Sequence, residues 1–80
     1  MLMGLLSRND LAQLQRAMED GAEISLTRTL GDVSVIASTS PAPPVWGCSM
    51  LVRLEIHRRN VYSSQYFSSV GDLAKSNSRL

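Results

Sequence analysis

Two short runs of alternating polar and apolar residues, joined by a basic turn, dominate the second half of this 80-residue chain. Residues 49–57 alternate as far as the only histidine, His57, and residues 61–67 alternate again after an Arg-Arg-Asn turn. Such alternation is typical of half-buried strands, because successive side chains of a strand point to opposite faces. The two runs therefore predict an antiparallel hairpin as the body of the fold.

A second hairpin is predicted from the residues that precede this one. Residues 23–30 and 33–37 alternate on either side of a Gly-Asp pair, which fits a two-residue turn with glycine first. Arg28 falls on the apolar face of this hairpin, and we expect it to extend past the rim of the sheet; the alternative is a paired or partner-contacting Arg. Residues 38–48 contain three prolines within four positions and are expected to connect the two hairpins as a loop.

Helix signals stand at both ends of the chain. Ser7, with Asp10 three residues later, predicts a capping box at the start of an apolar stripe, and Gly21 predicts the end of that helix. Ser69 and Asp72 form a similar pair before a short C-terminal helix, whose last residues 76–78 we expect to fray. The order α-β-β-β-β-α predicts an α+β fold: a four-stranded antiparallel sheet, made of two hairpins, with both helices packed on one face.

The size of the chain limits its core to that of one small domain, residues 1–80. Only 5% of the residues are aromatic, so the core must rest on aliphatic side chains, and a homodimer or a binding partner is a natural supplement to its stability. A formal charge of +1 gives no overall attraction to nucleic acid or to anionic membranes. The single cysteine and the short apolar segment 1–6 favour a cytoplasmic protein without membrane contact.

The register of the second hairpin decides the role of its aromatic side chains. A three-residue loop with Asn60 in the left-handed conformation would place Tyr62 and Tyr66 on the core face. A two- or four-residue loop would instead bury Val61 and Phe67 and turn both tyrosines to the opposite face. We favour the second arrangement because Val61 and Phe67 are the better core residues.

The sequence contains no recognisable catalytic or metal-binding pattern. Cys48 and His57 are the only conceivable nucleophile and base, and they lie at opposite ends of one predicted strand, about 30 Å apart. Seven scattered acids form no close in-facing pair, and the five glycines form no phosphate-binding loop. We therefore expect a protein that is not an enzyme and that uses no cofactor or metal.

The candidate binding residues lie on the sheet face opposite the helices and at the basic turn. Helices on one side of a sheet leave the other face available, and Arg and aromatic side chains are enriched at the centres of protein interfaces. The predicted partner-binding residues are Arg53, His57, Arg58, Arg59, Tyr62, Tyr66 and Trp46. We expect Trp46 to be buried at one end of the sheet; the alternative is an exposed interaction site.

These observations predict a non-catalytic protein-binding module whose partner is a larger protein or ribonucleoprotein complex. The alternatives are a small nucleic-acid-binding protein that uses the basic hairpin 53–59, and a structural subunit of a homo-oligomer. In size and architecture over its whole length, though in no diagnostic motif, the chain resembles small phage or mobile-element proteins that inhibit bacterial machinery, including anti-CRISPR inhibitors. This resemblance implies an inhibitor that blocks a surface of a larger bacterial complex.

Overall fold

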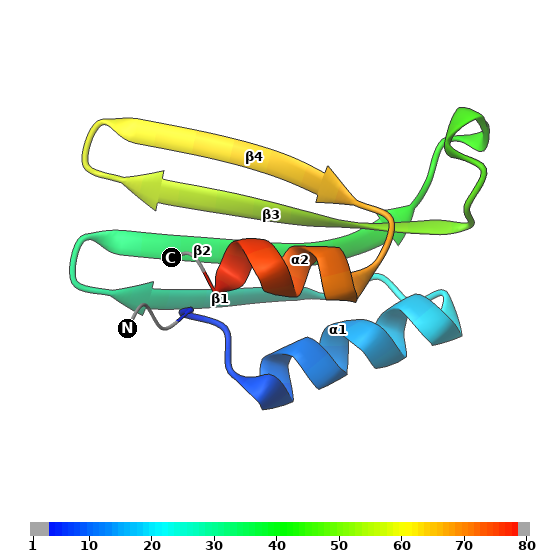
Figure 1. The fold of residues 1–80 in the computed structure, drawn as a ribbon, viewed down its shortest axis with the longest axis horizontal. Coiled ribbons are helices and arrows are strands. Elements are labelled where there is room, and N and C mark those ends of the chain that lie inside the picture. The colour runs from blue at the N-terminus through cyan, green and yellow to red at the C-terminus, as the bar shows by residue number, and fades with distance from the viewer. Residues whose placement is uncertain (1–3, 79–80) are drawn as a thin grey trace.

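The computed structural model describes residues 4–78, and it confirms the order α-β-β-β-β-α. Its elements are α1 (Arg8–Asp20), β1 (Ser25–Leu30), β2 (Val33–Pro41), the 3₁₀ helix η1 (Pro44–Trp46), β3 (Met50–Arg58), β4 (Val61–Phe67) and α2 (Val70–Asn77). The strands form one antiparallel sheet in the order β1-β2-β3-β4, with both helices on one side of it (Figure 1). Part of the apolar segment 1–6 lies outside the described residues.

The predicted caps position both helices. The Ser7 side chain accepts a hydrogen bond from the Asp10 N–H, and the Asp10 carboxylate accepts one from the Ser7 N–H, which completes the capping box. Gly21 ends α1 in the left-handed conformation, at φ 68°. Ser69 caps α2 by accepting from the Asp72 N–H. The start of each helix could therefore be predicted from short-range sequence signals.

The first hairpin has the predicted register but a longer second strand. Leu30 pairs with Val33 around the two-residue turn, as expected. Strand β2 continues through Pro41, so residues 38–41 belong to the sheet and the expected loop begins later. The reason is that β2 is an interior strand, and Pro41 still pairs with Met50 of β3. The buried Thr39 hydroxyl adds to this by donating a hydrogen bond to the Ala22 carbonyl, at 2.7 Å.

The second hairpin closes through a two-residue turn, with Arg58 paired to Val61. This register turns Tyr62 and Tyr66 away from the core, as we favoured. Phe67 is half-buried against the core, but the predicted burial of Val61 is wrong, because its side chain is 60% exposed. Val61 lies at the start of an edge strand, at the end remote from the connection between β4 and α2 (Figure 1).

The core lies between the sheet and the two helices. It is aliphatic, as the composition predicted, and each layer contributes to it. Its buried members are Leu6, Leu14, Val35, Ala37, Val52, Leu54, Val70 and Leu73. The most buried side chains come from α1, α2 and the two interior strands, so the edge strands β1 and β4 depend on pairing more than on burial.

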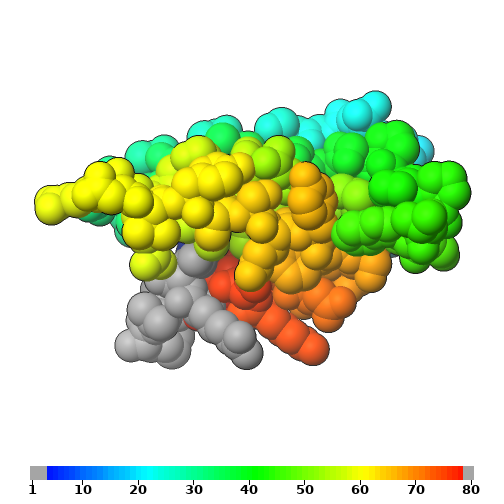
Figure 2. Space-filling model, turned by 90° about the horizontal axis from the view of Figure 1, so that it is seen from above, coloured from blue at the N-terminus to red at the C-terminus, as the bar shows by residue number. Residues whose placement is uncertain are grey.

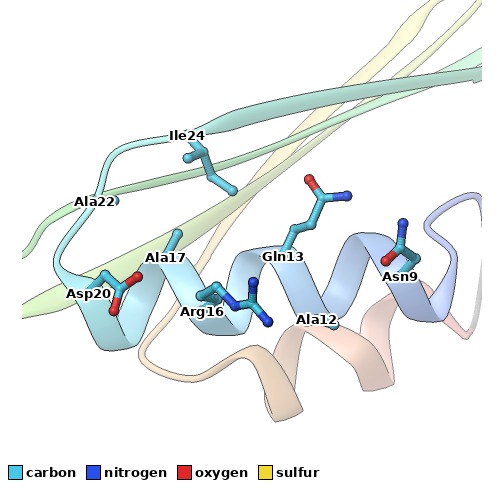
Figure 3. A pocket seen from close by; sticks show the side chains of 8 residues that line it. All are labelled: Asn9, Ala12, Gln13, Arg16, Ala17, Asp20, Ala22 and Ile24. Atoms are coloured by element: carbon cyan, nitrogen blue, oxygen red, sulfur yellow. The ribbon is translucent and has the colours of Figure 1, made fainter.

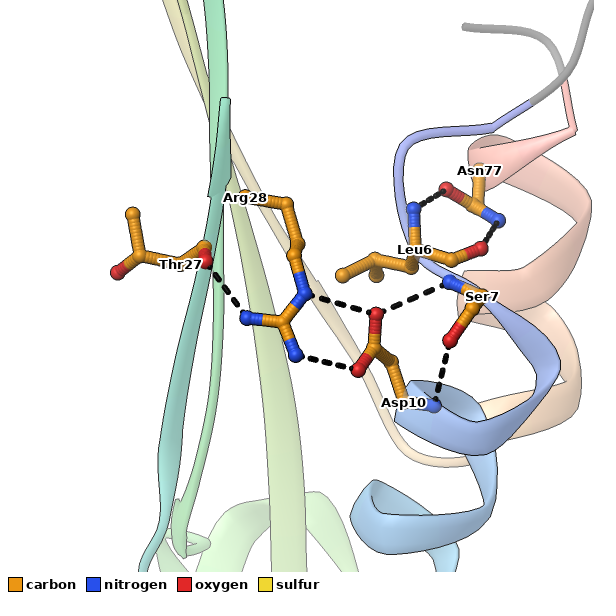
Figure 4. A network of polar contacts seen from close by, with 6 residues as sticks. All are labelled: Leu6, Ser7, Asp10, Thr27, Arg28 and Asn77. Atoms are coloured by element: carbon orange, nitrogen blue, oxygen red, sulfur yellow. Dashed lines mark hydrogen bonds and ion pairs between the residues drawn. The ribbon is translucent and has the colours of Figure 1, made fainter. Parts of the chain in front are cut away.

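The end of α2 does not fray as expected, because Asn77 is buried. Its Oδ1 accepts a hydrogen bond from the Leu6 N–H and its Nδ2 donates to the Leu6 carbonyl, both at 3.1 Å (Figure 4). A side chain on Gly4 would overlap that of Asn77. Asn77 therefore ties the segment before α1 to the last turn of α2, across 71 positions of sequence.

We expect Asn77→Ala to lower the free energy of unfolding by about 1–3 kcal/mol, because it leaves the buried backbone groups of Leu6 without partners. Urea unfolding followed by circular dichroism measures this change. Lys75→Ala, at an exposed position of the same helix, is the control and should change stability by less than about 0.5 kcal/mol. Equal effects of the two substitutions would contradict the assignment.

Candidate functional site

The sheet face opposite the helices presents polar and aromatic side chains from two neighbouring strands. Because side chains alternate along each strand, β3 and β4 each present every second residue on this open face. The register sets these residues opposite one another in pairs: Arg53 with Tyr66, Glu55 with Ser64, and His57 with Tyr62. Cross-strand neighbours of this kind are close enough for their side chains to interact.

A hydrogen-bond network fixes the position of Arg53 at the centre of this face. Its Nε donates to the Ser64 hydroxyl at 2.8 Å, and its Nη2 donates to the Tyr62 hydroxyl at 2.8 Å. The same Nη2 lies 2.8 Å from Glu55 Oε1, and the Tyr62 hydroxyl donates to that carboxylate oxygen at 2.7 Å. Glu55 therefore offsets the charge of Arg53, and four side chains hold each other in one arrangement.

Aromatic contacts extend this network in both directions. The Arg53 guanidinium carbon lies 5.6 Å from the centre of the Tyr66 ring, a cation–π contact. Trp46 meets Tyr66 edge to face at 6.1 Å, and His57 meets Tyr62 in the same way at 4.8 Å. The side chains form a continuous row, which we call the aromatic strip: Trp46, Tyr66, Arg53, Tyr62 and His57.

The expected burial of Trp46 is wrong, because its side chain is 42% exposed. The 3₁₀ turn η1 lies beyond the end of β2 and β3 and has no buried residue (Figure 1). The Trp46 ring contacts Tyr66 edge to face there and stays partly exposed to solvent. Tyr62 and Tyr66 are about half exposed, which makes the strip the main cluster of exposed aromatic side chains among the described residues.

The structure separates the two remaining candidates, Arg58 and Arg59, from the strip. Arg58 is one position removed from His57 in β3, so it points to the opposite side of the sheet. Arg59 lies in the turn and forms an ion pair at 3.1 Å with Asp32, in the turn of the other hairpin. Both charges of that pair are well exposed, so the pair contributes little to stability. Five of the seven candidates are therefore brought together.

Arg28 forms a second polar cluster, between β1 and α1 (Figure 4). Its Nε and Nη2 donate to the two carboxylate oxygens of Asp10 at 3.1 and 2.6 Å, and its Nη1 donates to the Thr27 carbonyl at 2.8 Å. Our expectation that Arg28 merely extends past the rim is wrong, and the paired alternative is confirmed. Burial raises the pKa of Asp10, but the hydrogen bonds from Ser7 and Arg28 outweigh it and hold that pKa below its ordinary value.

A hollow of about 300 Å³ lies between α1 and the chain entering β1 (Figure 3). It is on the helix side of the sheet, and none of the strip residues lines it. Arg16 and Asp20 are its only charged lining residues, and its lining includes no hydroxyl, thiol or imidazole group. The hollow therefore lacks the groups of a nucleophilic catalytic site.

The remaining reactive side chains are dispersed. Cys48 precedes β3 and His57 lies near the other end of that strand. Within residues 4–78, no three His, Cys, Asp or Glu side chains are grouped closely enough to hold a metal ion. None of the described helices has the length and apolar character needed to cross a membrane.

Sequence reasoning missed two residues that organise these clusters. Ser64 was not singled out, although in the favoured register it stands opposite Glu55 and beside Arg53. Asp10 was identified only as a capping residue, whereas it is also the buried partner of Arg28. An Arg on an apolar sheet face was the signal that a buried acid was required.

No family model, no curated protein and no solved structure matches this chain.

Proposed function

We propose that this chain is a non-catalytic protein-binding module that contacts its partner through the aromatic strip. The observation that carries the proposal is the unbroken series of side-chain contacts from Trp46 to His57 on the open face. Trp, Tyr and Arg are the residues most often found at the energetic centres of protein interfaces. The hydrogen bonds around Arg53 also restrain these side chains before binding, which reduces the entropy cost of ordering them.

The charge of the strip favours a protein partner over nucleic acid. Glu55 offsets Arg53, and Asp32 pairs with Arg59, so few cations remain uncompensated near the strip. Phosphate backbones are bound chiefly through clusters of uncompensated Lys and Arg, and that binding weakens steeply with salt. A nucleic-acid-binding function would therefore require strongly salt-dependent binding that depends on Arg58 and Arg59.

More specifically, we propose that the chain inhibits its partner by occupying one of the partner's surfaces. A small rigid domain with one contact face can block a surface of a larger protein or ribonucleoprotein complex without any chemistry of its own. The resemblance in size and architecture to small phage or mobile-element inhibitors, including anti-CRISPR proteins, supports this form. It implies a bacterial cytoplasmic target.

Affinity capture from a bacterial lysate, with matched variants, tests the proposal. We expect the wild-type chain to retain a stoichiometric protein partner, and Tyr66→Ala to reduce the retained amount at least tenfold, since an interface centre contributes about 2 kcal/mol or more. Leu30→Ala removes an apolar side chain that is more exposed than Tyr66, on the far edge of the sheet, and should retain the partner fully. Capture that Tyr66→Ala leaves unchanged would contradict the proposal.

A further inference from the structure

Strand β4 forms one edge of the sheet, and among the described residues no further strand pairs with its outer side. Figure 2 looks onto this edge, where the yellow-to-orange atoms of β4 form an exposed band along the molecule. The strand reads Val-Tyr-Ser-Ser-Gln-Tyr-Phe, without charge, proline or glycine. Edge strands usually contain charges, prolines or bulges, because free backbone groups pair readily with another strand. β4 has none of the residues that would prevent such pairing.

The register shows which backbone groups of β4 are free. Arg58 and Val61 flank the two-residue turn and form a hydrogen-bonded pair. Hydrogen-bonded and non-hydrogen-bonded pairs alternate along an antiparallel ladder. The N–H and C=O groups of Tyr62, Ser64 and Tyr66 therefore point away from β3, toward the space beside the sheet.

The opposite edge, β1, differs because Arg28 obstructs it. Leu30 and Val33 form the hydrogen-bonded pair next to the turn, and counting back along β1 by the same alternation makes Thr27 a residue whose backbone groups point outward. Arg28 Nη1 donates a hydrogen bond to the Thr27 carbonyl at 2.8 Å. The ion pair with Asp10 holds Arg28 in this position. An inward-pointing charged side chain is one of the means by which proteins protect a sheet edge. The sheet thus has one edge at which a charged side chain occupies an outward carbonyl, and one edge, β4, without such a charge.

We propose that β4 pairs with β4 of a second copy of this chain, antiparallel, about a two-fold axis at Ser64. This register sets Ser64 opposite Ser64 and Tyr62 opposite Tyr66, so that all the outward backbone groups of the two strands meet. It is also the register that pairs every residue of the strand, with Val61 opposite Phe67. The result is one continuous eight-stranded sheet, in which the aromatic strips of the two copies become neighbours.

The strand is complementary to itself in this register, which is why the occupant is a second copy. Aromatic side chains face aromatic ones on the open face, and on the other face Val61 meets Phe67 and Ser63 meets Gln65. Aromatic and β-branched cross-strand pairs are stabilising, and a strand without charges brings no like charges together. Pairing also shields Val61, which is 60% exposed in the single chain, while the open face that carries both tyrosines stays accessible. A two-fold contact of this type closes on itself and forms no fibre.

Light scattering coupled to gel filtration tests the proposal. We expect the wild-type chain to have twice its 8.8 kDa chain mass at high micromolar concentration and to dissociate on dilution. Ser63→Lys with Gln65→Lys sets like charges directly opposite each other and should raise the dissociation constant at least about tenfold. Ser63→Lys with Gln65→Glu sets opposite charges there and should restore the dimer. Both positions are exposed, so circular dichroism should show both variants folded.

Disulfide formation tests the register itself. In a Cys48→Ser background, Ser63→Cys and Gln65→Cys proteins are prepared separately, because positions 63 and 65 face each other as a non-hydrogen-bonded pair. Such a pair has Cα atoms about 4.5 Å apart, within the range that a disulfide spans. The mixture should cross-link faster than either protein alone. A monomer at every concentration, equal behaviour of the two charge variants, or cross-linking without preference for the mixture would overturn the proposal.

Discussion

Replacing Leu54 with alanine is expected to lower the free energy of unfolding by about 2–5 kcal/mol, the cost typical of a cavity in a tightly packed core. Leu54 is 1% exposed and lies in β3, an interior strand that contacts both helices. A domain of this size seldom has more than about 3–5 kcal/mol of stability, so the variant should be largely unfolded at 37 °C. Thermal unfolding followed by circular dichroism measures the loss.

Leu30→Ala is the matched control for this prediction. It removes the same atoms from a side chain that is 70% exposed, at the end of β1, and should change stability by less than about 0.5 kcal/mol. If the two variants unfolded at the same temperature, the core would not lie between the sheet and the helices as described.

Replacing Arg28 with methionine is expected to cost about 2 kcal/mol at neutral pH, because it leaves the buried Asp10 carboxylate without its guanidinium partner. A fully buried pair would give a larger effect, but the Arg28 side chain is 43% exposed and water can reach the site. Chemical denaturation of Arg28→Met and of Asp10→Asn measures the change. The double variant should lose less stability than the sum of the two single losses, since each single substitution already breaks the same Arg28–Asp10 interaction.

The same site predicts a pH dependence whose sign follows from the lowered pKa of Asp10. A carboxyl group whose pKa is lower in the folded state favours folding when it is ionised. This contribution is present above the ordinary value of 3.8 and is lost as the pH falls through the lower pKa of the folded state. Unfolding measured between neutral pH and pH 2 should therefore show a smaller acid-induced loss in Asp10→Asn than in the wild type. An identical acid profile for both would show that Asp10 is not held by this network.

Local sequence signals were sufficient to predict most of the fold. Helix caps such as Ser7 with Asp10 act over three residues, and a Gly-Asp turn fixes a hairpin register, so their consequences do not depend on distant parts of the chain. The second register was predicted because one choice gave better core residues than the other. Once it was fixed, the alternation of β3 and β4 placed His57 and both tyrosines on one face.

The features that could not be predicted depend on contacts between distant residues. A loop has no periodic pattern from which burial can be predicted. The exposure of Trp46 depends instead on where η1 meets the end of the sheet. Asn77 lies in a Ser-Asn-Ser sequence typical of a fraying helix end, yet it bonds to Leu6 at the other end of the chain. The partner of Arg28 was likewise 18 residues away, in an element predicted only for its cap.

The most direct test of the proposed contact face is hydroxyl-radical footprinting of the protein, free and bound to its captured partner. Side chains that face solvent are oxidised, and those at an interface are protected. Trp46, Tyr62 and Tyr66 are exposed in the free protein, so all three should be oxidised there and protected in the complex. If they remain as reactive in the complex as in the free protein, while side chains of α1 or β1 become protected, the partner binds elsewhere and the account is wrong.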